Sequence, residues 1–188
     1  RPVKMVMSRE EVFKGSGPSS GAVVRVKMGA TKDGKFVAGF AELKYQAGAF
    51  QGSPVGPGAM CAFAPYDLEN VHVVGFDVVS NRPKVAAYRA PGAPISEFAV
   101  ESVIDELAQR LGIDPIEFRR RNLLREGRPQ ATGTVMKDAA IEKVLERLEA
   151  LMDWKVPLKP ATGSVKKGRG IAIGFKACVS PTTSLARR

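Results

Sequence analysis

The sequence predicts an α+β fold, with a mostly antiparallel sheet in the first half and two to three helices packed on it in the second half. Up to about residue 85, apolar and polar side chains alternate with the period of half-buried strands. After Pro94 the apolar residues recur at helical spacing. The 188 residues, 44% of them apolar, are enough for one packed domain. We expect a β-rich part over 1–85, a loop and helical part over 86–153, and a connector with a final strand over 154–188.

The first two strand predictions lie before residue 46. Residues 1–8 alternate Val3, Met5 and Met7 with polar neighbours, and the adjacent acidic pair that follows suits an exposed surface. Residues 22–45 predict a hairpin, because two alternating stretches flank Asp33-Gly34, a dipeptide typical of tight turns.

A Gly- and Pro-rich stretch over 46–60 is expected to lack regular structure. Residues 69–81 then predict another strand. His72, the single histidine, lies inside it, where a satisfied or exposed strand residue is a better interpretation than a ligand or catalytic base.

Three helices are predicted in the second half. The first follows Pro94, buries a stripe from Phe98 to Leu111 and ends at Gly112. The second has Asp114 as N-cap and a proline directly after it, the best-specified local start in the chain. The third begins near residue 138, with a buried stripe of Ile141, Val144, Leu145, Leu148 and Leu151. Residues 170–180 predict the final strand.

The formal net charge of +10 raises the hypothesis of a nucleic-acid partner. The densest basic run, Phe118–Pro129, contains no interleaved aromatic residues that could stack on bases. A solvated face, or a surface that meets an acidic partner domain, is the favoured interpretation. A basic α+β binding module without catalysis stays as the alternative function.

Few residues in the sequence suggest catalysis. The two cysteines, Cys61 and Cys178, share no metal-ligand spacing with each other or with the histidine, and we expect both to be reduced and structural. No phosphate loop and no Ser-His-Asp set can be nominated, so no catalytic or metal-binding residue is predicted. If the chain serves an enzyme, a cofactor carries the chemistry.

Three stretches resemble one known family. In order and spacing, RPVKMVMSREEVF (1–13), the segment from VAAYRAPGAP to RRRNLL (85–124) and GRGIAIGFKACVSPTTS (168–184) resemble the molybdopterin-binding large subunit of the xanthine dehydrogenase and aldehyde oxidase family. The resemblance covers nearly the whole chain. It implies a molybdenum-containing oxidoreductase that uses Mo-molybdopterin, with the cytosine dinucleotide form as one alternative.

The resemblance implies that the AYRAPGAP loop forms part of the cofactor pocket, with Arg89, Ala90 and Gly92 as cofactor-binding residues. Small residues allow a close backbone approach, and the N-terminus of the following helix favours an anionic ligand. An ordinary salt-bridging or carbonyl-binding loop arginine is the alternative for Arg89. Pro91, Thr182 and Thr183 are candidate substrate contacts, although the two threonines also suit polar strand-end positions.

Departures from the family pattern narrow the expected substrate. Copper-containing carbon monoxide dehydrogenases have a cysteine where this chain has Ala90, which argues against a copper site. Xanthine-specific members have an aromatic residue where this chain has Pro91, which argues against a purine. Oxidative hydroxylation of an aldehyde or of an aromatic or N-heterocyclic compound is therefore expected.

The family's remaining cofactor loops and its catalytic glutamate lie outside the region that this chain matches. We expect the chain to be an internal portion of the large subunit that binds no cofactor stably and is inactive alone. A stand-alone interaction or assembly protein that kept the fold is a further alternative.

The implied partners are the remainder of the large subunit, an iron-sulfur subunit or domain, an FAD subunit or domain, and a second copy in a homodimer. No apolar run is long enough to span a membrane, so no membrane partner is expected. The cytoplasm is the expected location, with the periplasm as the alternative.

Overall fold

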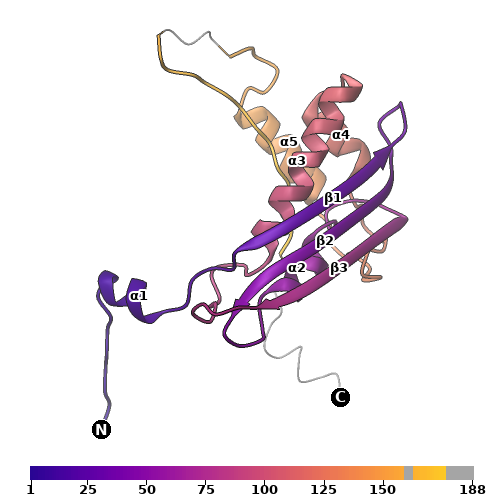
Figure 1. Ribbon diagram of the computed structural model, residues 1–188. Coiled ribbons are helices and arrows are strands. Elements are labelled where there is room, and N and C mark those ends of the chain that lie inside the picture. The colour runs from indigo at the N-terminus through magenta and orange to yellow at the C-terminus, as the bar shows by residue number, and fades with distance from the viewer. Residues whose placement is uncertain (159–162, 177–188) are drawn as a thin grey trace.

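The chain forms three strands and five helices within residues 1–158 and 163–176, which the computed structural model describes (Figure 1). The elements in chain order are α1 (Arg9–Gly15), β1 (Ala22–Ala30), β2 (Phe36–Gly48), α2 (Val55–Cys61), β3 (Asn70–Val79), α3 (Ala93–Leu111), α4 (Pro115–Asn122) and α5 (Ile141–Leu151). The α+β prediction is confirmed.

The sheet has the order β1-β2-β3. β1 and β2 form the predicted antiparallel hairpin, and its turn places Gly34 at a φ of +86°, a left-handed conformation that favours glycine. β3 pairs parallel to β2, so the sheet is mixed where mostly antiparallel pairing was expected. The physical reason is the connection: a crossover that contains α2 returns the chain to the same end of the sheet before β3 begins.

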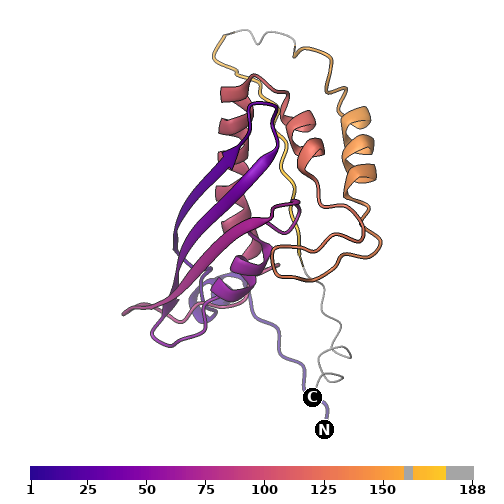
Figure 2. The ribbon, with the colours of Figure 1, turned by 90° about the vertical axis from the view of Figure 1, so that its right-hand side faces the viewer.

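α3 covers the inner face of the sheet, and α4 and α5 lie on the other side of α3 (Figure 2). The main core joins the sheet to α2, α3 and α4; its fully buried members include Leu43, Tyr45, Phe63, Ile104 and Phe118. A smaller core joins α4, α5 and the segment near Ile171. This packing fixes the N-terminal end of α3. The segment that leads into it, residues 80–92 between β3 and α3, is the arginine loop.

The boundaries of α3 and α4 follow their local sequence signals. Gly112 ends α3 in the left-handed conformation, with a φ of +65°. The Asp114 carboxylate accepts hydrogen bonds from the amides of Ile116, at 2.9 Å, and Glu117, at 3.1 Å, and so caps α4 as predicted.

Two predictions for the first half are wrong. Residues 1–8 form no strand, because no neighbouring strand pairs with them and their side chains are exposed. Ser8 instead caps α1: its hydroxyl accepts from the Glu11 amide while the Glu11 carboxylate accepts from the Ser8 amide. The stretch 46–60 was expected to lack regular structure, but it contains most of α2, which packs against β2, β3 and α3.

Further corrections concern the second half. Phe98 was assigned to the buried stripe of α3, yet it is 77% exposed, because the sheet meets the opposite side of the helix through Val100 and Ile104. On α5, Val144 and Leu151 are likewise exposed. Of the final strand predicted over 170–180, the described part, 170–176, pairs with no strand and runs along α3 instead.

Candidate functional site

The arginine loop connects β3 to α3, and neighbouring segments hold its first residues. The Val85 amide donates to the Ala47 carbonyl at 3.1 Å, and the Ala86 amide donates to the Pro18 carbonyl at 3.0 Å. A Cβ on Gly17 would lie 2.1 Å from the Lys84 carbonyl oxygen, so the backbone at Gly17 approaches the backbone at Lys84 closely. The loop therefore begins from a fixed position.

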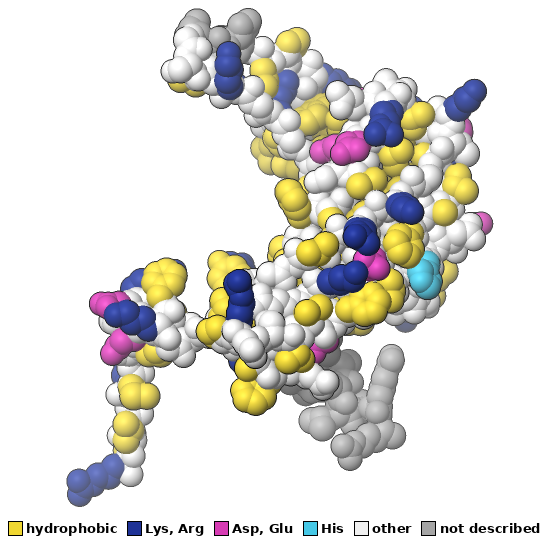
Figure 3. All heavy atoms as spheres, viewed as in Figure 1, with side chains coloured by type: hydrophobic (Ala, Val, Ile, Leu, Met, Phe, Trp, Pro, Cys, Tyr) yellow, Lys and Arg dark blue, Asp and Glu magenta, His cyan; other side chains and the backbone are white. Residues whose placement is uncertain are grey.

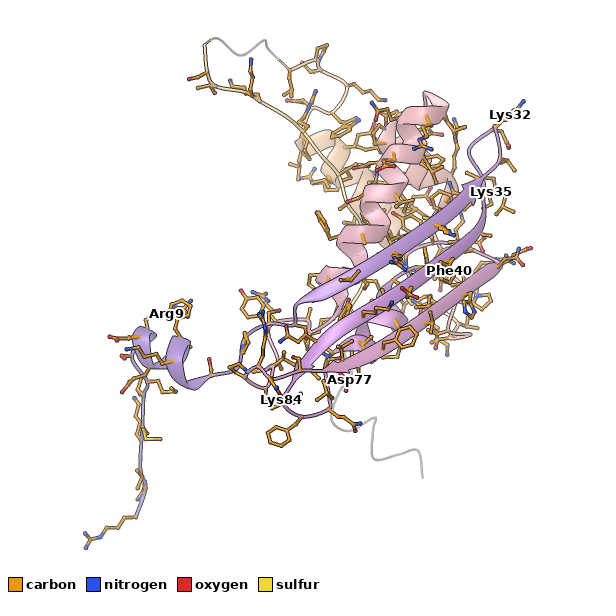
Figure 4. The ribbon with its side chains drawn as sticks, in the orientation of Figure 1. Arg9, Lys32, Lys35, Phe40, Asp77 and Lys84 are labelled. Atoms are coloured by element: carbon orange, nitrogen blue, oxygen red, sulfur yellow. The ribbon has the colours of Figure 1, made fainter. Side chains whose placement is uncertain are left out.

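Polar contacts at the end of the sheet support the same region. In Figure 4, Asp77 of β3 and Lys84 lie close together at this end. The Asp77 carboxylate accepts from the amides of Gly52, at 2.7 Å, and Ser53, at 2.8 Å, and the Lys84 ammonium donates to the Gly52 carbonyl at 2.8 Å. The nearby Ser53 hydroxyl and the hydrogen bonds from the Gly52 and Ser53 amides lower the pKa of Asp77.

Gly92 ends the loop in a conformation that only glycine fits. Its φ is +92°, and a Cβ there would lie 2.1 Å from the Pro54 carbonyl oxygen. The hydroxyl of Tyr45, which is fully buried in β2, donates to the Gly92 carbonyl at 2.9 Å. The Ser96 hydroxyl of α3 donates to the Gly58 carbonyl of α2 at 2.8 Å. Burial raises the pKa of Tyr45 to about 12, so its hydroxyl keeps its proton at neutral pH.

Arg89 and Ala90 lie at the exposed turn of the loop. Arg89 is exposed and has no ion-pair or hydrogen-bond partner within residues 1–158 and 163–176. Ala90 has a φ of +55°, a strained backbone conformation for a residue with a Cβ. A small cavity of about 90 Å³ is lined by residues that include Arg89, Ala90, Pro91 and Gly92.

These features fit an anionic ligand. They combine a guanidinium with no internal partner, a close-packed glycine and the N-terminal end of the 19-residue α3, where helix amides favour negative charge. Four of the predicted site residues, the consecutive Arg89 to Gly92, line this one cavity. The other two, Thr182 and Thr183, lie outside the described residues, as does Cys178. Ser19 and Ser20 also line the cavity and were not predicted, because nothing in their local sequence marks them.

A buried ion pair links α3 to α4, and sequence reasoning missed it. Arg119 is 0% exposed, and its guanidinium donates to the Glu101 carboxylate at 2.8 Å and pairs with Asp105 at 2.8 Å. The Tyr66 hydroxyl donates to the other oxygen of Glu101. Burial is the largest single influence and lowers the pKa of Arg119, but Glu101, Tyr66 and Asp105 together outweigh it and raise that pKa above its usual value.

The basic run Phe118–Pro129 is largely neutralised within the chain. Arg120 pairs with Glu117 and Glu149, Arg121 pairs with Glu117, and Arg125 and Arg128 pair with Glu142 and Asp67. Guanidinium groups held by carboxylates are poorly available to phosphates. The observation counts against the nucleic-acid alternative.

The outer face of the sheet carries His72, the single histidine of the sequence. Figure 3 shows hydrophobic and basic side chains interspersed on this face, with the histidine at its edge. His72 is exposed and stacks on Phe40, with ring centroids 5.7 Å apart, as expected for a strand residue. Within the described residues, no group of three His, Cys, Asp or Glu side chains is arranged to hold a metal ion. No described helix is long and apolar enough to cross a membrane.

The sequence pattern of the molybdopterin cofactor-binding domain matches residues 1–123, which include the arginine loop. The chain belongs to this family. It is 33% identical over 165 residues to the nicotinate dehydrogenase large molybdopterin subunit of Eubacterium barkeri, covering 82% of this chain and 38% of that protein. It is 30% identical over 186 residues to a putative xanthine dehydrogenase molybdenum-binding subunit of Escherichia coli, covering 91% of this chain and 24% of that protein.

A solved relative of the family has the same fold. The aldehyde oxidoreductase from Desulfovibrio gigas superposes with a TM-score of 0.68 at 29% identity, covering 73% of this chain and 16% of that one. The chain thus spans well under half the length of the relatives it matches. The resemblance to molybdenum hydroxylase large subunits is confirmed.

Proposed function

We propose that this chain forms one wall of the Mo-molybdopterin pocket in a molybdenum-dependent oxidoreductase. The observation that carries the proposal is Arg89, an exposed guanidinium with no described internal partner, on a loop held by Tyr45 and Gly92 at the start of α3. The family match over 1–123 supports it. The proposed activity is oxidative hydroxylation of an aldehyde or of an aromatic or N-heterocyclic compound.

When bound, the cofactor supplies the two-electron redox chemistry. The chain's own residues bind and orient. Arg89 pairs with an anionic group of the cofactor, and its planar guanidinium suits phosphate oxygens. Ala90 and Gly92 let the backbone approach the ligand, and the Tyr45 hydroxyl keeps the loop in place. The cytosine dinucleotide form of the cofactor stays an alternative, because no residue here distinguishes the forms.

The substrate proposal rests on two positions in the loop. Ala90 provides no thiolate for a copper ion, and Pro91 provides no ring to stack on a purine. Relatives of similar identity are named for nicotinate, xanthine and aldehydes, so their names do not choose among these classes. We propose Pro91, Thr182 and Thr183 as substrate contacts.

The proposed partners are those of a molybdenum hydroxylase: the remainder of a large subunit, an iron-sulfur subunit or domain, an FAD subunit or domain, and a second copy in a homodimer. The proposed location is the cytoplasm. The exposed apolar side chains of α5, Val144 and Leu151, are available for such contacts.

The 188-residue chain alone is expected to retain little cofactor. Its loop cavity of about 90 Å³ is small, whereas ligand pockets commonly enclose roughly 300–1,000 Å³ and bury most of the ligand. We expect molybdenum far below one atom per chain in the purified protein, measured by mass spectrometry, and no hydroxylase activity. Near-stoichiometric molybdenum would refute this expectation.

The decisive experiment compares wild type, Arg89→Ala, Arg89→Lys and Arg82→Ala in the natural polypeptide, purified from cells that supply the cofactor. Arg82 is the matched control, an exposed arginine seven positions earlier that does not line the cavity. Losing a charged hydrogen-bond donor to an anion is worth roughly 1.5–3 kcal/mol, so we expect R89A to weaken cofactor binding by about tenfold or more, with R89K intermediate. Equal molybdenum and pterin contents in R89A and R82A would refute the role of Arg89.

A further inference from the structure

An extended segment, residues 170–176, lies against α3 and is called the strap below. It passes between α3 and α5 and runs toward the N-terminal end of α3 (Figure 2). Ile171 is buried in the smaller core, and Ile173 packs against both cores. In its described part, the strap has no strand beside it to satisfy its backbone amides.

Two carboxylates of α3 take the place of a neighbouring strand. The Phe175 amide donates to Glu97 Oε1 at 2.6 Å, and the Ile173 amide donates to Glu101 Oε2 at 2.9 Å. Positions four apart on a helix are separated by about 6 Å along its axis. Alternate amides of an extended chain are separated by about 6.6 Å. The two spacings match, so the pair of carboxylates sets the register of the strap.

The residue between the two donors fits this arrangement. A Cβ on Gly174 would lie 3.1 Å from Glu97 Oε2, so the glycine leaves room for the carboxylate. A groove of about 490 Å³ between α3 and the strap is lined by Pro94, Glu97 and Gly174, among others. Pro94 also lines the Arg89 cavity, so the groove along the strap reaches the arginine loop.

The two carboxylates differ in their surroundings. Glu101 is also bound by the Arg119 guanidinium and the Tyr66 hydroxyl, which hold it as part of the core. Glu97 has no basic partner within the described residues, and the Phe175 amide is its hydrogen-bond donor there. Glu97 therefore serves the strap alone.

We propose that Glu97 is a positioning residue, which with Glu101 clasps the strap to α3 and places it as a second wall beside the Arg89 loop. The clasp, which is the pair of hydrogen bonds from Phe175 to Glu97 and from Ile173 to Glu101, follows from the contacts above. That it helps to form the cofactor pocket rests on the proposed function. Glu97 acts through the Phe175 amide and touches neither cofactor nor substrate.

Amide hydrogen exchange of the 188-residue chain tests the clasp without any cofactor. We expect Glu97→Ala to speed exchange of the Ile173–Lys176 amides by about tenfold, the effect of losing a hydrogen-bond acceptor. Glu97→Gln keeps an acceptor oxygen and should protect these amides at least as well as wild type. Glu106→Gln, an exposed carboxylate on the same helix, is the matched control and should change nothing.

Phe175→Pro removes the donor without altering α3, so it should reproduce E97A, and the double variant should exchange no faster than either single one. Leu43 and Tyr45 in the core report whether a variant unfolds as a whole. Unchanged strap exchange in E97A, equal exchange in E97Q and E97A, or additive effects of E97A and F175P would each overturn the clasp. Since the exchange needs no cofactor, these failures are distinct from a failure of R89A to lower molybdenum content.

Discussion

Replacing Arg119 by methionine tests the buried connection between α3 and α4. Methionine keeps much of the aliphatic stem but removes the guanidinium that meets Glu101 at 2.8 Å. Both partners are buried, with 0% of Arg119 and 5% of Glu101 exposed. The variant therefore leaves a carboxylate inside the fold, held by the Tyr66 hydroxyl and the Ile173 amide but without its counter-charge.

Breaking one side of a buried ion pair costs roughly 3–5 kcal/mol of unfolding free energy. In a domain of this size each kcal/mol lowers the melting temperature by about 2–4 °C, so we expect a decrease of roughly 6–20 °C. The double variant with Glu101→Gln should lose less than the sum of the two single losses, because it leaves no unpaired charge buried; Asp105, the other partner of Arg119, is half exposed.

Thermal and urea unfolding followed by circular dichroism measure these losses. Arg121→Met is the matched control: it lies two positions further on α4, its pair with Glu117 is about 40% exposed on both sides, and exposed pairs contribute at most about 1 kcal/mol. A loss below about 1 kcal/mol for R119M, or strictly additive losses in the cycle with E101Q, would refute the reasoning.

Further predictions concern the loop and the strap. A positive φ alone costs a residue with a Cβ roughly 1–3 kcal/mol. Gly92→Ala should lower the unfolding free energy in urea by more than this, because the new Cβ would also meet the Pro54 carbonyl. Gly112→Ala is the control, since Gly112 also has a positive φ but lies in open space, and equal losses in the two variants would contradict the close approach. Tyr45→Phe should lose about 1 kcal/mol in the same assay, since it deletes the hydrogen bond to Gly92, and an unchanged midpoint would argue against that contact. Burial raises the pKa of Glu97 above its usual 4.5, so the folded state favours the protonated carboxyl. This contribution to the unfolding free energy is fully present below pH 4.5 and is lost as pH rises through the folded pKa. Glu97→Gln should then melt higher than wild type at neutral pH and alike at acidic pH; a pH-independent difference would speak against this titration.

The parts of the fold predicted correctly are those with local signals. The Asp33-Gly34 turn, Gly112 and the Asp114 cap each satisfy their own backbone within a few residues, so spacing alone identifies them. The capping box from Ser8 to Glu11 was equally local and could have been found. The alternation of apolar and polar residues over 1–8 and 170–176 wrongly predicted strands. A strand also needs a neighbouring strand, and a local pattern does not show whether one exists.

The candidate site was predictable only in part. The small and rigid residues around Arg89 mark the loop, and the family resemblance suggested the cofactor-binding role that we propose for it. The groups that hold the loop and the strap could not be read locally: Tyr45 contacts Gly92 across 47 positions, Ser96 contacts Gly58 across 38, and Glu97 contacts Phe175 across 78. Their side chains are ordinary core or helix residues until the fold brings them together.

The distribution of charge gives the physical reason to look for an anion at the loop. Arg119, Arg120, Arg125 and Arg128 each meet a carboxylate from another part of the chain, so the densest basic run holds elements together. Arg89 has no such partner in the described residues and sits on a loop that keeps strained backbone at its turn. Strain of this kind persists where surrounding contacts enforce it, and it is common at ligand sites. The Arg89 guanidinium makes no stabilising contact within the described residues, while buried groups such as Tyr45 hold its loop in place. This combination is expected of a residue that binds an external anion.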